Sequence, residues 1–95
     1  MNYVLVNDTI VRETEASVAV EDRGYQFGDG IYEVVGVYGG KCFKLDEHLA
    51  RLQRSAREIG LDLPYGLPEL KRHLLKLLEL DPGADGMIYF QVSRG

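Results

Sequence analysis

The sequence has one cysteine, no tryptophan, three prolines and no long apolar run. A single cysteine, Cys42, excludes an intrachain disulfide and a zinc site built from cysteines. No apolar stretch approaches the ~18 residues of a membrane span, and the start lacks the basic segment and apolar core of a signal peptide. Basic residues are also few, 11 against 15 acidic ones, and the net charge of −4 argues against a nucleic-acid binder. We therefore expect a cytoplasmic protein without membrane or nucleic-acid partners.

What the sequence does contain is typical of a folded domain. Apolar residues make up 45% and charged residues 27%, and 95 residues allow one small domain, residues 1–95. Strands are followed by two helices and another strand, which predicts an α+β fold with a small antiparallel sheet. The expected strands cover residues 3–6, 9–11, 31–38, 41–43 and 87–93, and the expected helices cover residues 47–59 and 68–80.

Turn and cap residues delimit these elements. Asn7-Asp8 and Gly39-Gly40 are suited to two-residue hairpin turns. Asp46 is a suitable N-cap for the first helix, and Gly60 a suitable residue just after its end. The apolar stripe of that helix is made by Leu49, Leu52, Ala56 and Ile59. Three arginines lie off the stripe, and their ordinary interpretation is solvated surface charge: Arg51, Arg54 and Arg57.

Alternation along the strands predicts which side chains share a face. In residues 31–38, one face carries Ile31, Glu33, Val35 and Val37, and the other carries Tyr32, Val34, Gly36 and Tyr38. In the last strand, Ile88, Phe90 and Val92 alternate with Tyr89, Gln91 and Ser93.

Residues 23–30 combine three glycines with two aromatic rings. Composition alone favours a tight turn anchored by two buried rings over a loop shaped around a partner or ligand, because glycine permits both positive φ and close backbone approach.

Motifs alone predict neither a catalytic residue nor a metal site. His48 and His73 fall in different predicted helices, and neither has a second ligand at metal spacing. Cys42 is expected to be a half-buried packing residue. The lysines flank a hairpin strand or lie on the polar side of a helix, so none is an obvious desolvated amine.

Residues 21–35 read Glu-Asp-Arg-Gly-Tyr-Gln-Phe-Gly-Asp-Gly-Ile-Tyr-Glu-Val-Val. This stretch resembles the N-terminal region of the fold-type IV aminotransferases, which use pyridoxal 5′-phosphate (PLP), and most of all the D-amino-acid aminotransferases. The resemblance continues through residues 46–52 and 88–95. Branched-chain aminotransferases and aminodeoxychorismate lyases share much of the Gly-Asp-Gly pattern and are the alternatives within the family.

The resemblance implies roles for four residues. Arg51 matches the arginine that binds the cofactor phosphate, and guanidinium suits such a contact. Tyr32 matches a tyrosine that helps to bind the substrate carboxylate. Val34 would line the substrate pocket, and Tyr89 resembles a strand tyrosine near that pocket across the dimer interface. Gly36 stands where some relatives carry a long side chain. The loop at residues 23–30 would then lie at the rim of the site and at a dimer interface.

The resemblance also implies what this chain does not carry. The Schiff-base lysine, the acidic partner of the pyridine nitrogen and a second phosphate-binding loop belong to a larger C-terminal domain. We therefore expect residues 1–95 to be the small N-terminal domain of a homodimeric enzyme that converts D-alanine and 2-oxoglutarate to pyruvate and D-glutamate. Alone it would be inactive.

Two other hypotheses remain open at this point. The first is a stand-alone dimerising domain without phosphate affinity. The second is a non-functional remnant, whose Ile31, Val35 and Phe90 would be exposed for want of a covering domain.

Overall fold

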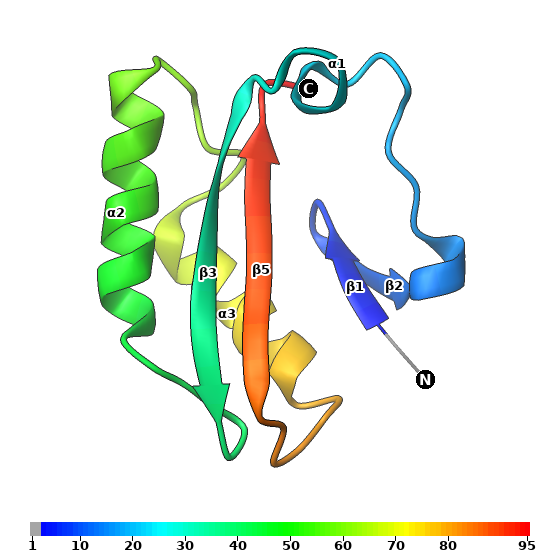
Figure 1. Cartoon of the computed structure of the whole chain (residues 1–95), viewed down its shortest axis with the longest axis vertical. Helices are drawn as coiled ribbons and strands as arrows, with labels where there is room; N and C mark the ends of the chain where they lie inside the picture. Colours follow the sequence, from blue (N-terminus) through cyan, green and yellow to red (C-terminus); the bar gives the residue numbers. More distant parts are fainter. Residues whose placement is uncertain (1–2) are drawn as a thin grey trace.

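The computed structural model describes residues 3–95. Its elements are arranged as the sequence predicts, with strands first, then two long helices and a final strand (Figure 1). In chain order they are β1 (Tyr3–Val6), β2 (Thr9–Arg12), the 3₁₀ helix η1 (Glu13–Glu15), α1 (Arg23–Phe27), β3 (Gly30–Tyr38), β4 (Lys41–Cys42), α2 (Leu45–Glu58), α3 (Leu67–Leu78) and β5 (Gly86–Ser93).

Both sheets are antiparallel, which confirms the α+β class. β1 and β2 form a two-stranded hairpin, and the second sheet has the order β4-β3-β5. The predicted turns hold: Asn7 has a φ of 57°, and Gly39 and Gly40 have φ values of 58° and 78°. Positive φ at both turn residues, as at Gly39-Gly40, matches the right-handed twist of the flanking strands, whereas in the first turn only Asn7 has a positive φ. β4 is shorter than predicted and pairs only with Val37 and Tyr38 of β3.

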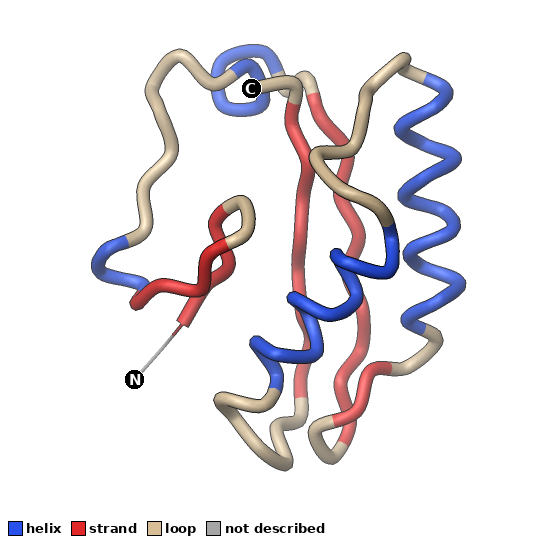
Figure 2. Tube along the Cα trace, turned by 180° about the vertical axis from the view of Figure 1, so that it is seen from behind, coloured by secondary structure: helices blue, strands red, loops and turns tan. Residues whose placement is uncertain are grey.

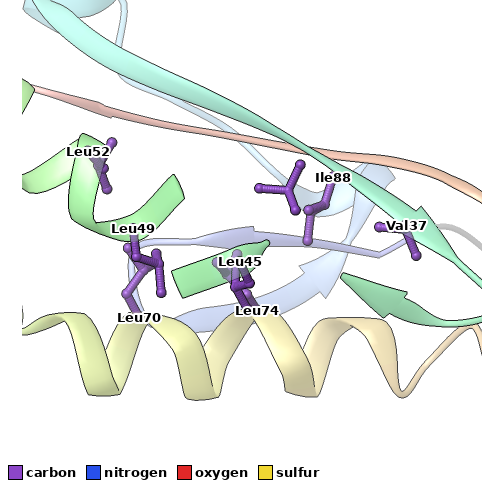
Figure 3. Packing of buried hydrophobic residues seen from close by; sticks show 8 residues of the cluster. Val37, Leu45, Leu49, Leu52, Leu70, Leu74 and Ile88 are labelled. Carbon is purple, nitrogen blue, oxygen red and sulfur yellow. The ribbon is translucent and has the colours of Figure 1, made fainter. Parts of the chain in front are cut away.

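Helices α2 and α3 cover the same face of the three-stranded sheet (Figure 2). The buried side chains come from both helices and from one face each of β3 and β5, and Figure 3 shows how they interdigitate. The residues of this cluster are Val35, Val37, Leu45, Leu49, Leu52, Leu70, Leu74 and Ile88. In the described part of the chain, none of the helices is both long and apolar enough to span a membrane.

The ends of α2 differ in two ways from the prediction. The helix begins at Leu45 after Lys44, which has a φ of 56°, so Asp46 is not the N-cap and its carboxylate instead accepts a hydrogen bond from Lys71 Nζ at 2.8 Å. An early start lets Leu45 join the core, whereas Ile59 is 42% exposed and leaves the stripe. Gly60 follows the helix with a φ of 64°, as predicted.

The prediction of a turn with buried rings at residues 23–30 is wrong. The segment forms the short helix α1, and the Phe27 ring is 67% exposed, with the Arg23 guanidinium 5.0 Å above it. The other ring, that of Tyr25, lies outside the described side chains. Close packing explains two glycines here: a Cβ at Gly24 would lie 2.6 Å from Ser93 Cβ, and one at Gly30 would lie 2.7 Å from the Val92 carbonyl oxygen.

The hypothesis of a non-functional remnant predicts that Ile31, Val35 and Phe90 are exposed, and the structure contradicts it. Val35 is fully buried, and Ile31 and Phe90 are half-buried against the core. Cys42 is also half-buried, as expected for a packing residue. The exposed face of the sheet is the opposite one, which carries Tyr32, Tyr38, Met87 and Tyr89. The helices therefore cover one face of the sheet and leave the face with the candidate substrate residues open.

Candidate functional site

The three candidate substrate residues lie together on the open face of the sheet. Strand pairing places Val34 directly opposite Tyr89, and Tyr32 opposite Gln91. The rings of Tyr32 and Tyr89 stack at a centroid distance of 5.7 Å and an interplanar angle of 26°. Tyr89 donates its hydroxyl hydrogen to Gln91 Oε1 at 2.7 Å, whereas no described residue hydrogen-bonds to the hydroxyl of Tyr32. Of these two stacked phenols, the Tyr32 hydroxyl is thus the one available to a ligand.

A buried carboxylate lies on the other face of the same strand. Glu33 is only 3% exposed, and it occupies a position on β3 between core residues. His48 Nδ1 lies 2.7 Å from Glu33 Oε1. Arg51 donates from Nη2 to the same oxygen at 2.8 Å and from Nε to Oε2 at 2.9 Å. Because burial of an unpaired charge is costly, these three contacts are what allows a carboxylate at this position.

Arg51 is therefore more than solvated surface charge. One edge of its guanidinium, Nε and Nη2, donates hydrogen bonds to Glu33, while the side chain remains 60% exposed. The outer edge, formed by Nη1 and the second N–H of Nη2, is free to bind an anion end-on. By contrast, Arg54 and Arg57 are exposed on the same helix without a described ion pair. Arg51 is the arginine of the three that is built into the fold.

The ion pair shifts both of its partners toward the charged form. Hydrogen bonding from Arg51 lowers the pKa of Glu33 below its ordinary value of 4.5, against the opposing effect of burial, and His48 adds to the lowering. The pKa of Arg51 is raised, first by its hydrogen bond with Glu33 and to a smaller extent by Tyr32.

A small pocket of about 170 Å³ lies where α1 approaches the sheet, lined by Gly24, Gly28, Gly30, Ile31, Tyr32 and Gln91. Asp29 fixes this segment. Its carboxylate accepts hydrogen bonds from Arg23 Nε at 2.8 Å and Arg94 Nε at 2.9 Å. Arg94 also donates to the carbonyl oxygens of Ile59 and Gly60 at the end of α2. The glycine-rich segment is thereby tied both to β5 and to α2.

Sequence reasoning missed Glu33 and His48. A signal was present for Glu33, because it is the one charged residue on a strand face that otherwise carries Ile31, Val35 and Val37. Such a residue needs a partner when that face is buried. His48 offered a weaker signal, since it lies three residues before Arg51 and so on the same side of α2.

Comparison with known proteins places this chain in a family. The sequence pattern of the amino-transferase class IV family matches residues 30–95, which is more than half of the chain. The chain therefore belongs to the class IV aminotransferases.

One relative by sequence and two solved structures show what this chain is similar to. The D-alanine aminotransferase of Bacillus licheniformis is 51% identical over 92 residues, 97% of this chain and 32% of that protein. The PLP-bound form of a hypothetical aminotransferase from Mycobacterium tuberculosis superposes with a TM-score of 0.84 and 26% identity, over 98% of this chain and 34% of that one. A branched-chain aminotransferase from Thermoproteus uzoniensis, crystallised with norvaline, gives a TM-score of 0.76 and 31% identity, over 95% and 31%. The chain thus spans about a third of the length of the relatives that it matches.

Proposed function

We propose that these residues form the N-terminal part of a PLP-dependent D-amino-acid transaminase, which converts D-alanine and 2-oxoglutarate to pyruvate and D-glutamate. The observation that carries the proposal is the 51% identity to a D-alanine aminotransferase across 97% of this chain. Identity to the branched-chain aminotransferase is 31%. A branched-chain aminotransferase, an aminodeoxychorismate lyase and a non-catalytic dimerising domain are the competing functions.

In this proposal the described residues bind and orient rather than carry out the covalent chemistry. The outer edge of Arg51 holds the cofactor phosphate. The Tyr32 hydroxyl donates to the substrate carboxylate, and Val34 and Tyr89 form the apolar wall beside it. PLP, when bound, supplies the electron sink for amino-group transfer. The lysine that carries PLP would come from the remaining two thirds of the protein, so residues 1–95 alone should not transfer amino groups.

The donor groups in this structure fit such a cofactor. A phosphate needs a fixed cation with free N–H groups, and Arg51 is held by Glu33 while its outer edge stays exposed. A carboxylate needs a neutral or cationic donor on a rigid element, and Tyr32 lies in the nine-residue strand β3 with its hydroxyl unused.

We also propose a cytoplasmic homodimer. The open sheet face exposes Tyr32, Met87 and Tyr89 close together, and a second copy or the rest of the protein would bury these side chains. The protein to measure is a fusion of residues 1–95 to the other two thirds of the Bacillus licheniformis D-alanine aminotransferase. Sedimentation velocity of this fusion should show a dimer, and a monomer at all concentrations would contradict the proposal. Cell fractionation tests the location.

A fusion makes the proposal testable. Residues 1–95 replace the matching section of the Bacillus licheniformis D-alanine aminotransferase, which supplies the other two thirds. In the fusion, Arg51→Ala should weaken PLP binding by at least about tenfold, since it removes hydrogen bonds between charged groups. Binding of pyridoxal, which lacks the phosphate, should change little. Titrations followed by cofactor absorbance measure both affinities.

Arg54→Ala is the matched control for this experiment. It removes an arginine one helical turn away on α2 that has no described ion pair, so PLP affinity should stay as in the unmodified fusion. Equal PLP affinity in Arg51→Ala and Arg54→Ala would remove Arg51 from the phosphate site.

The substrate contact has its own test. Tyr32→Phe removes only the hydroxyl, so KM for D-alanine should rise about tenfold while PLP affinity is retained. Tyr38→Phe makes the same chemical change on the same strand and face, and should leave KM unaltered. Steady-state kinetics of the fusion decide the point, and an unchanged KM in Tyr32→Phe would exclude the proposed carboxylate contact.

A further inference from the structure

Glu33 is the buried charged residue of the described core, and none of the roles proposed above uses it directly. We infer that Glu33 is a positioning residue, which fixes the side chains of Arg51 and His48 so that Arg51 presents its outer edge to the phosphate. This inference rests on the proposed function, because it concerns the same phosphate contact.

The hydrogen bonds define how the three side chains are fixed. An ionised carboxylate can only accept, so the His48 nitrogen that faces it, Nδ1, carries the proton. Glu33 Oε1 accepts from both His48 and Arg51, and Oε2 accepts from Arg51 alone. The two parallel bonds to Arg51 fix the plane and the rotation of the guanidinium, which a single contact would not do.

The position of Glu33 in the fold makes it a rigid anchor. It lies within the part of β3, residues 30–37, that is paired with β5, and its side chain is packed under α2. Arg51 has a long, flexible side chain that would sample many rotamers in solvent. Because Glu33 removes that freedom before a ligand arrives, less side-chain conformational entropy is lost when the phosphate binds.

The negative charge of Glu33 has an opposing effect, because it reduces the attraction between Arg51 and an anion. The exposure of Arg51 limits that effect. The Arg51 side chain is 60% exposed, so solvent screens charges around its outer edge. The positional constraint is not screened. Loss of the carboxylate should therefore weaken phosphate binding rather than strengthen it.

Glu33→Gln in the fusion tests the inference. Glutamine keeps the shape but replaces one acceptor by a donor, which cannot hold Arg51 Nε and Nη2 together. PLP affinity should fall about tenfold, while pyridoxal affinity stays within about twofold. Lys71→Gln breaks the exposed Lys71–Asp46 pair between α3 and α2 and should change neither affinity.

Double substitution separates positioning from a general structural role. If Glu33 acts through Arg51, Glu33→Gln should cause no further loss of PLP affinity in an Arg51→Ala background. Equal losses for PLP and pyridoxal, additive losses in the double variant, or tighter PLP binding by Glu33→Gln would each overturn the inference. If Arg51→Ala itself leaves PLP affinity unchanged, the proposed phosphate site fails. If only Glu33→Gln is without effect, the phosphate site stands and the positioning role fails.

A measurement on the unsubstituted fusion keeps the inference testable if Glu33→Gln does not fold. The Arg51 Nε–H signal in a nitrogen-15 spectrum, assigned by its absence in Arg51→Lys, should be protected from exchange with water before any ligand is added. Addition of PLP should shift the Nη signals and leave the Nε–H signal protected. A rapidly exchanging Nε–H in the ligand-free protein would contradict the anchor.

Discussion

At the residue scale, Glu33 shows how a buried charge is kept in a small core. Burial alone would raise its pKa, but the hydrogen bond from Arg51 and the contact with His48 outweigh burial and lower it. Its contribution to stability is therefore fully present above its ordinary pKa of 4.5 and is lost as the pH falls through its lower folded-state pKa.

Titration of the Glu33 side-chain carboxyl tests this residue directly. Carbon-13 chemical shifts of the fusion should give a midpoint below 4.5. In Arg51→Ala the main cause of the lowering is absent while burial remains, so the midpoint should move upward. A wild-type midpoint above 4.5, which burial without an ion pair would produce, would contradict the observed contacts.

Sequence alternation grouped two of the three candidate substrate residues, Tyr32 and Val34, on one face. The pairing of β3 with β5, which alternation does not predict, brings Tyr89 to them. The same alternation placed Glu33 on the core face. It could not show that Glu33 meets His48 and Arg51, because those contacts depend on how α2 packs against β3.

At the scale of elements, close approach decides where glycine is required. A Cβ at Gly30 would lie 2.7 Å from the Val92 carbonyl oxygen and 3.1 Å from Ser93 Cα. Both are backbone atoms, so no change of side-chain rotamer can relieve the clash. Gly30→Ala should therefore push the start of β3 away from β5, at a cost of about 1–3 kcal/mol.

Hydrogen exchange in the fusion measures that effect locally. The Arg94 amide donates to the Asp29 carbonyl and the Arg23 amide to the Gly95 carbonyl, so both amides should lose protection in Gly30→Ala. Gly66→Ala is the matched control, because the added Cβ would meet only Pro68 Cδ at 3.7 Å and φ there is −70°. Its effect should stay within about 0.5 kcal/mol. Unchanged protection of both amides in Gly30→Ala would contradict the close packing of the start of β3 on β5.

The start of α2 and the presence of α1 differ from the prediction for different physical reasons. Asp46 has the side chain of an N-cap, but Lys44 in the left-handed region starts the helix earlier and Asp46 pairs with Lys71. Helix α1 contains glycine, which disfavours helix, yet Asp22 caps it by accepting from the Gly24 amide at 2.8 Å. Tertiary packing against Ser93 then favours the small residue at position 24.

At the scale of the whole molecule, one sheet face is covered and the other is open (Figures 1 and 2). The covered face could be predicted from the strand pattern and the helix stripes. The partner of the open face could not, because the chain spans about a third of its relatives' length. We propose that the cofactor phosphate binds the outer edge of Arg51 and that the substrate binds at Tyr32 on this open face.

The most direct test of the central claim is the choice of amino donor by the fusion. With 2-oxoglutarate as acceptor, we expect pyruvate from D-alanine and no 2-oxo acid from L-valine, with Tyr32→Phe lowering the rate at low D-alanine. A folded, PLP-loaded fusion that accepts L-valine and rejects D-alanine would contradict the D-amino-acid assignment. A folded fusion that transfers from neither donor would contradict the catalytic role of this chain.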